Sequence, residues 1–243
     1  VVWFGGEPLL GIKQIESLYR KMILIPDKNY SFSIISNGFL ISPDIIKLFK
    51  EMKLQHIQIT LDGLKETHNK IKFTKNENDT FSRTIKNIDL LASSAPEIRI
   101  SIRVNMNKEN SSEFITLYSF ILQRYKSNPL IGIYPAFITS TSSKSSSSCS
   151  LLFNRQEKSE FIQQLYYDRG IVTNLCGYPD SSFTECSIRN KHTFTIDPEG
   201  YLYKCWEIIG DQKYAIAKLD SEGTIQSIDQ KILNRYLYAA DPL

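Results

Sequence analysis

The chain has few cysteines and no excess of charge of either sign. Four cysteines occur in 243 residues, and 29 basic residues face 26 acidic ones, for a net charge of +3. So few cysteines exclude a scaffold built from disulfides and favour a reducing, cytoplasmic location. The small net charge gives no reason to expect nucleic acid as a partner. No apolar run reaches the roughly 18 residues of a membrane-spanning helix, so we expect no membrane partner either.

The chain also lacks a starting methionine, a signal peptide and a closing element. It begins with the apolar run Val1-Val2-Trp3-Phe4, which has no charged leader. It ends at Asp241-Pro242-Leu243. We therefore expect an internal fragment of a longer protein.

Short apolar runs alternate with helical patterns through the first half of the chain. One strand followed by one helix, repeated, is typical of a parallel sheet. Five such strands form either an open doubly wound sheet or an incomplete barrel, and in both a ligand binds at the carboxyl ends of the strands. The predicted strands span 1–4, 31–35, 57–61, 98–104 and 130–135.

A serine-rich segment at 139–150 separates this pattern from the rest of the chain. Its low complexity predicts a loop and a domain boundary. We expect an α/β domain at 1–150, a connection with one helix at 151–185, and a small module at 186–243. The connecting helix begins with Asn154 and Glu157, the spacing of a capping box, and Asn110 with Glu113 has the same spacing.

The first strand ends in Gly5-Gly6-Glu7-Pro8. Two glycines let a ligand approach the backbone closely, and a carboxylate suits a ligand ammonium. Pro8 fixes the turn into the following helix. A plain turn, in which Glu7 caps that helix, explains the tetrapeptide equally well.

The next two strands also end in turns that contain glycine. Each turn is a common signal by itself, but at successive strand ends the three turns would line one rim of one sheet. Asp62 suits the hydroxyl pair of a ribose. His68 follows it, and we interpret both His68 and His192 as surface or capping groups, with no catalytic residue assigned. The turns are Ser36-Asn37-Gly38 and Thr60-Leu61-Asp62-Gly63.

The strand at 98–105 is apolar on one face and polar on the other, whereas a central parallel strand is usually apolar on both. Its polar face indicates either a wet cavity inside a barrel or an edge strand in contact with solvent. Arg103 is suited to pair with a ligand carboxylate. The polar residues are Arg99, Ser101, Arg103 and Asn105.

Cys186 and Cys205 flank a predicted hairpin that would bring them close together. Paired thiolates bind zinc or the iron of an iron–sulfur cluster, although two cysteines do not complete a site. Cys149 lies in the serine-rich loop and is interpreted as incidental. Cys176 is either a third ligand or a buried thiol, and we favour the thiol.

Taken in order, these motifs resemble the radical S-adenosylmethionine (SAM) superfamily, in particular its members with a C-terminal SPASM domain. Residues 3–10 are similar to that family's GGEP motif, and residues 36–38 to its TNG turn. Residues 59–63 with His68 resemble an S-x-DG…H…R segment in which Lys72 replaces the arginine. Asp79-Thr80-Phe81 resembles a GTF helix start, and Cys186-x13-Gly200-x4-Cys205 the opening of the SPASM pattern.

The resemblance implies a partial (β/α)6 TIM-like barrel followed by the start of a small Fe–S module. It implies that Cys186 and Cys205 bind an auxiliary [4Fe–4S] cluster. The family's C-x3-C-x2-C loop for the catalytic cluster would lie before Val1, so the fragment itself would be inactive. The residues that it implies for S-adenosylmethionine are Gly5, Gly6, Glu7, Pro8, Ser36, Asn37, Thr60, Asp62 and Arg103.

The resemblance further implies an enzyme that uses a 5′-deoxyadenosyl radical to modify a peptide or protein side chain, as in ribosomal peptide maturation. A reductant such as flavodoxin or ferredoxin would be a partner. One alternative is an anaerobic sulfatase-maturating enzyme, which forms formylglycine. Another is a non-catalytic scaffold that binds a peptide or a cluster. A hydrolase with zinc-bound cysteines ranks last, because the chain has no P-loop and no G-x-S-x-G motif.

Overall fold

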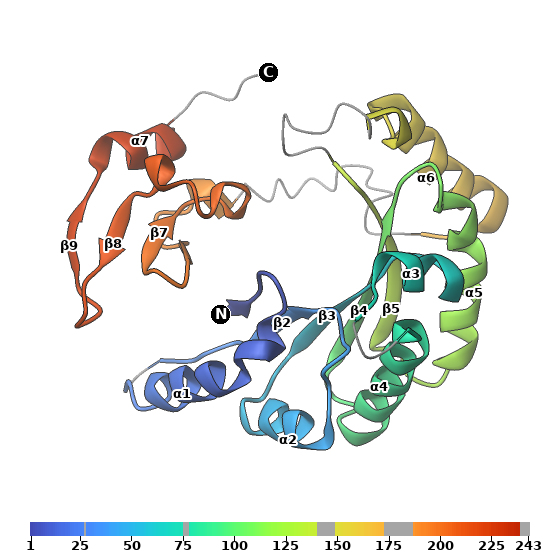
Figure 1. Ribbon diagram of the computed structural model, residues 1–243, viewed down its shortest axis with the longest axis horizontal. Coiled ribbons are helices and arrows are strands. Elements are labelled where there is room, and N and C mark those ends of the chain that lie inside the picture. The colour runs from blue at the N-terminus through green and yellow to red at the C-terminus, as the bar shows by residue number, and fades with distance from the viewer. Residues whose placement is uncertain (27, 75–77, 140–148, 173–186, 239–243) are drawn as a thin grey trace. The chain divides into compact units, whose positions relative to one another are not determined.

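The computed structural model describes residues 1–26, 28–74, 78–139, 149–172 and 187–238 (Figure 1). The chain divides into two compact units, Val1–Gly177 and Tyr178–Leu243. Within the described ranges, no helix combines the length and the apolar character needed to cross a membrane.

A five-stranded parallel sheet forms the centre of the first unit. Its strand order, β1-β2-β3-β4-β5, follows the chain without a reversal. A doubly wound sheet would reverse its order at a switch point, so this topology is that of a partial barrel. Figure 1 shows the helices along the outer side of the curved sheet. The strands are β1 (Val2–Trp3), β2 (Ser33–Ser36), β3 (His56–Leu61), β4 (Arg99–Met106) and β5 (Ile131–Phe137).

The helices between the strands begin at residues that the sequence marks as caps. Ser42 and Asp79 each accept a hydrogen bond from the backbone of the helix that follows. The α-helices of this unit are α1 (Ile12–Met22), α2 (Pro43–Glu51), α3 (Lys65–Ile71), α4 (Thr80–Ser94), α5 (Phe114–Arg124) and α6 (Arg155–Arg169). Short 3-10 turns are η1 (Pro8–Gly11), η2 (Ser111–Glu113) and η3 (Cys149–Leu151).

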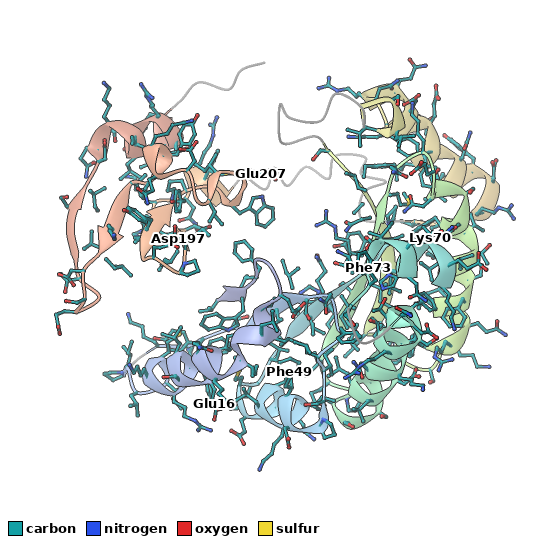
Figure 2. The ribbon with its side chains drawn as sticks, viewed as in Figure 1. Glu16, Phe49, Lys70, Phe73, Asp197 and Glu207 are labelled. Carbon is teal, nitrogen blue, oxygen red and sulfur yellow. The ribbon has the colours of Figure 1, made fainter. Side chains whose placement is uncertain are left out.

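The two faces of the sheet differ in polarity. On the helix-facing side, paired isoleucines form continuous rows, and Phe49 of α2 is fully buried in the core they share (Figure 2). β4 alternates buried with partly exposed residues although it lies between β3 and β5. The alternative of an edge strand is therefore wrong, and the polar side chains of β4 line the inner face of the sheet. One isoleucine row is Ile34, Ile57, Ile100 and Ile131.

Helix α6 packs on the first unit. Leu165 is buried in its core, and Phe161 and Ile162 pack against that core. Asn154 accepts from the backbone N–H of Glu157, whose carboxylate accepts from the backbone of Asn154, so the predicted capping box is confirmed. The domain limits at 150 and 185 remain predictions.

The second unit is a small antiparallel sheet with strand order β6-β7-β8-β9. Its hairpin pairs Thr195 with Tyr203, as predicted, and Gly200 adopts a positive φ of 82° in the turn. Leu202, Ile216 and Ala217 form its buried core. The elements are η4 (Ser187–Arg189), β6 (Thr195–Ile196), β7 (Tyr201–Tyr203), η5 (Trp206–Ile208), η6 (Gln212–Tyr214), β8 (Ala217–Leu219), β9 (Ile225–Ile228) and α7 (Gln230–Tyr238).

Candidate functional site

One carboxylate joins the turns after β1 and β2. Glu7 Oε1 accepts hydrogen bonds from the backbone N–H of Leu9 at 3.0 Å and from Ser36 Oγ at 2.8 Å. Glu7 Oε2 accepts from the backbone N–H of Asn37 at 2.8 Å. Glu7 therefore caps η1 and also links two strand ends. A carboxylate has about four acceptor positions, so one position remains for a further donor such as an ammonium.

The glycines of these turns have two different roles. Gly38 has a φ of 75°, and a Cβ there would lie 2.9 Å from Ile59 Cγ2, so this position needs glycine for close packing. Gly5 and Gly6 also have positive φ, at 96° and 49°, but an added Cβ would meet nothing within 4 Å. The backbone at Gly5 and Gly6 is thus open to a ligand.

Asp62, directly after β3, is buried in a polar network. Its Oδ1 accepts from Asn105 Nδ2 at 3.1 Å, and its backbone N–H donates to His68 Nδ1 at 3.2 Å. Its Oδ2 has no hydrogen-bond partner, and Lys72 Nζ lies 3.8 Å from it. A buried carboxylate oxygen without a donor is costly, so Asp62 has unused capacity for a hydroxyl.

His68 is only 2% exposed, so its interpretation as a surface group is wrong. Burial lowers its pKa, and the positive charge of Lys72 lowers it further, while Asp62 acts in the opposite direction less strongly than burial. Its Nδ1 accepts the N–H of Asp62, so the neutral imidazole fixes the turn after β3.

Asn110 joins the loops after β3 and β4. Its Nδ2 donates to the backbone carbonyls of Asp62 at 2.8 Å and Asn105 at 3.0 Å. The side chain makes no capping hydrogen bond to its own helix, so the capping box predicted for Asn110 and Glu113 is wrong. Its Oδ1, the atom that a cap would use, accepts instead from the backbone N–H of Asn107 at 2.9 Å.

Glu113 has a long-range role as well. Its Oε2 accepts from the backbone N–H of Leu64 at 2.6 Å and its Oε1 from Thr67 Oγ1 at 2.5 Å, so it caps α3 instead of its own helix. A Cβ at Gly63 would lie 2.5 Å from Glu113 Oε2, which explains the glycine. Nothing in the local periodicity of residues 105–125 indicates these contacts.

The inner face carries a row of polar side chains near the carboxyl ends of the strands. Thr60, Arg103 and Tyr134 are paired neighbours on β3, β4 and β5. Arg103 Nε is buried and has no hydrogen-bond acceptor. Tyr134 donates its hydroxyl to Gln58 Oε1 at 2.6 Å. Neither Gln58 nor Tyr134 was predicted from the sequence, although the alternation of β3 is a signal that could have indicated Gln58.

The predicted cofactor residues thus fall into two groups. Glu7, Ser36 and Asn37 are hydrogen-bonded together, whereas Asp62, Thr60 and Arg103 lie on β3 and β4 or at their ends. Among the described residues, no side-chain hydrogen bond links the two groups. Pro8 only begins η1.

Of the predicted cluster ligands, the structure describes only Cys205. It is a free, partly exposed thiol that precedes η5. Cys186 and Cys176 lie outside the described residues, as does the side chain of Cys149. Among the residues that are described, no three His, Cys, Asp or Glu side chains gather as a metal site. The metal role of Cys186 and Cys205 remains a prediction.

Comparisons with known proteins identify similar sequences. Residues 1–121 match the family model of the Radical SAM superfamily. The chain is 33% identical over 123 residues to the cysteine-type anaerobic sulfatase-maturating enzyme of Clostridium novyi (strain NT), a match that covers 48% of this chain and 31% of that protein. It is 25% identical over 121 residues to Fe-coproporphyrin III synthase of Methanosarcina barkeri (strain Fusaro / DSM 804), covering 50% and 28%. The chain thus matches about a third of the length of these relatives.

Solved structures with the same fold include "Native anSMEcpe with bound AdoMet". It superposes with a TM-score of 0.65 at 19% identity, covering 96% of this chain and 65% of the other. "Native anSMEcpe with bound AdoMet and Cp18Cys peptide" gives 0.65 at 20% identity, covering 96% and 66%. These similarities confirm the predicted α/β partial-barrel fold. The match of residues 1–121, about half of the chain, to the family model places this part of the chain in the radical SAM superfamily.

Proposed function

We propose that this chain is the S-adenosylmethionine-binding part of an enzyme that modifies a peptide or protein side chain. The observation that carries the proposal is the set of unused polar atoms at the carboxyl ends of the strands. They are the remaining acceptor position of Glu7, the Oδ2 of Asp62, which accepts no hydrogen bond and has only the Lys72 ammonium at 3.8 Å, and the unpaired Nε of Arg103. S-adenosylmethionine carries an ammonium, a ribose diol and a carboxylate, which complement Glu7, Asp62 and Arg103, respectively.

Glu7 and the backbone of Gly5 and Gly6 would hold the methionine ammonium. The carboxylate of Glu7 is already fixed by Ser36 and Asn37, so little conformational entropy is lost when it binds a cation. A charge-assisted hydrogen bond of this kind is stronger than a neutral one.

Thr60 and Asp62 would bind the ribose hydroxyls. The carboxylate of Asp62 is bonded by Asn105, and its backbone N–H and C=O are bonded by the side chains of His68 and Asn110. Its position is therefore fixed before a ligand binds. Arg103 would pair with the methionine carboxylate. A guanidinium donates hydrogen bonds, and no acceptor in the described part of the chain bonds the Nε of Arg103.

With a reduced [4Fe–4S] cluster, S-adenosylmethionine would supply radical chemistry for hydrogen-atom abstraction from the substrate. The described residues would contribute orientation, because Glu7, Asp62 and Arg103 would each hold one group of the cofactor at the carboxyl ends of the strands. Cys186 and Cys205 would bind an auxiliary cluster, and flavodoxin or ferredoxin would supply the electron.

The proposal includes two substrate classes. Maturation of a ribosomally made peptide is our first proposal. The 33% identity to an anaerobic sulfatase-maturating enzyme favours the alternative, in which a cysteine of a sulfatase is converted to formylglycine. Mass spectrometry separates them: loss of the cysteine sulfur from a sulfatase-motif peptide supports the alternative, and a crosslink in a precursor peptide supports the first.

Calorimetric titration with S-adenosylmethionine tests the cofactor site. The protein, produced from its natural reading frame without oxygen, is compared with Glu7→Gln and Asp62→Asn. Each change removes one charge without changing shape, and we expect Kd to rise about tenfold or more. Glu160→Gln on the exposed side of α6 is the control. Binding that is unchanged in both site variants would contradict the proposal.

A further inference from the structure

A hydrogen bond crosses strand β4 on the inner face of the sheet. Tyr134 on β5 donates to Gln58 on β3 at 2.6 Å. The register places Tyr134 beside Arg103, whereas Gln58 pairs with Ser101, one row closer to the amino ends of the strands. The contact therefore runs diagonally over β4, between the rows of Ser101 and Arg103.

Gly132 leaves space for this contact. It occupies the position on β5 that pairs with Ser101, and a Cβ there would meet nothing within 4 Å. No side chain from β5 thus competes with the phenol for Gln58. The space on the amino-terminal side of Arg103 is filled by a neutral pair whose donor and acceptor satisfy each other.

Arg103 remains unpaired next to this pair. Its Nε is buried without an acceptor, and none of the described carboxylates forms an ion pair with it. The guanidinium lies near the phenol: burial raises the pKa of Tyr134, and the positive charge of Arg103 opposes that rise. A guanidinium that is partly removed from water needs an anionic partner, because an unpaired buried charge is costly.

We propose that Tyr134 and Gln58 are positioning residues for Arg103. Their hydrogen bond fills the inner face behind Arg103 and leaves its guanidinium free to pair with the carboxylate of a ligand at the carboxyl ends of the strands. This inference rests on the proposed function, in which that carboxylate belongs to S-adenosylmethionine.

The neutrality of Gln58 is the central element of the proposal. A glutamate at this position would still accept the hydrogen bond of Tyr134, but its charge would neutralise Arg103 from within the protein. The ligand carboxylate would then meet no net positive charge. Gln58→Glu therefore separates the electrostatic role of the pair from its role in packing.

The test compares the Kd of S-adenosylmethionine with that of its decarboxylated analogue, which lacks only the carboxylate. In the wild-type protein we expect S-adenosylmethionine to bind about tenfold more tightly or better. Arg103→Met should bring the ratio close to one. Gln58→Glu should remove the preference or reverse it, because the analogue carries a higher positive charge. Tyr134→Phe should weaken S-adenosylmethionine about three- to tenfold and the analogue less than about twofold.

Tyr118→Phe on α5 and Gln163→Glu on α6 are the matched controls, and both should leave the ratio unchanged. A Gln58→Glu protein that folds and keeps the wild-type ratio of the two Kd values would overturn the proposal, whatever ratio Tyr134→Phe gives. A Gln58→Glu protein that binds both ligands equally more weakly would also overturn it, because only packing would then be affected. A wild-type protein that binds neither ligand would instead contradict the proposed function, so the two failures are distinguishable.

Discussion

Two segments of this chain have the same spacing of asparagine and glutamate and fold differently. Asn154 and Glu157 form a capping box at the start of α6. Asn110 and Glu113, with identical spacing, bind groups that are 46 to 49 residues away in sequence, apart from two contacts of the Asn110 side chain with the backbone of Asn105 and Asn107. A local pattern predicts a local structure only where no distant group competes for the same side chains.

The difference in surroundings explains the two outcomes. Asn154 begins an exposed helix end, where the N–H groups of its own helix are the nearest partners. Asn110 is 4% exposed and lies near the ends of β3 and β4, where its Nδ2 bonds the carbonyls of Asp62 and Asn105 and its Oδ1 bonds the N–H of Asn107. Buried carbonyls must be satisfied, so the amide of Asn110 goes to them.

The largest effect should come from Asn110→Ala. The substitution leaves the carbonyls of Asp62 and Asn105 without this buried donor, and we expect a loss of about 2–3 kcal/mol in the free energy of unfolding. Asn154→Ala, the matched variant, should cost about 1 kcal/mol. Urea unfolding measures both.

The same two variants, Asn110→Ala and Asn154→Ala, separate an effect on the cofactor site from an effect on helix stability alone. Asn110→Ala should also raise the Kd for S-adenosylmethionine, because Asp62 loses a support, while Asn154→Ala should leave that Kd unchanged. Equal costs for the two variants would show that the contacts of Asn110 add nothing to those of an ordinary cap.

Glu113→Gln should have the next largest effect. Both of its oxygens accept hydrogen bonds, from Leu64 N–H and Thr67 Oγ1, and the amide NH2 of a glutamine cannot accept the bond at the oxygen it replaces. We expect a loss of about 1–2 kcal/mol in the free energy of unfolding. Hydrogen exchange should show the loss first in α3, which Glu113 caps. Faster exchange in α5 with α3 unchanged would mean that Glu113 stabilises its own helix after all.

The sequence predicted the elements and turns that depend on nearby residues. The strand periods, the caps at Ser42 and Asp79, the hairpin at 195–203 and the three rim turns were all readable, because each depends on residues a few positions apart. The Gln58–Tyr134 contact joins residues 76 positions apart, and its existence depends on the register of three strands. No single-strand pattern contains that register, so this part of the site required the structure.

The smallest effect is a difference in pH dependence between the two regions. His68 beside Asp62 has a folded-state pKa below its ordinary 6.5, mainly because it is buried. The unfolded chain therefore binds more protons, and stability is lost as the pH falls below about 6.5. Glu157 beside Lys108 has a pKa below its ordinary 4.5, because the ammonium and the backbone of Asn154 favour the carboxylate. Its contribution is lost only as the pH falls below about 4.5.

Thermal unfolding at pH 7.5 and 5.5 separates these two contributions, since this interval lies near the ordinary pKa of a histidine and well above that of a glutamate. The melting temperature of His68→Asn should fall less than that of the wild type between the two values, because Asn offers an acceptor to Asp62 N–H without titrating. Glu157→Gln should parallel the wild type over this interval and diverge only in more acidic buffer. His56, whose pKa is also lowered by burial, is present in all three proteins and cancels in the comparison. Equal slopes for His68→Asn and the wild type would mean that burial does not lower the proton affinity of His68 in the folded protein, and would contradict this prediction.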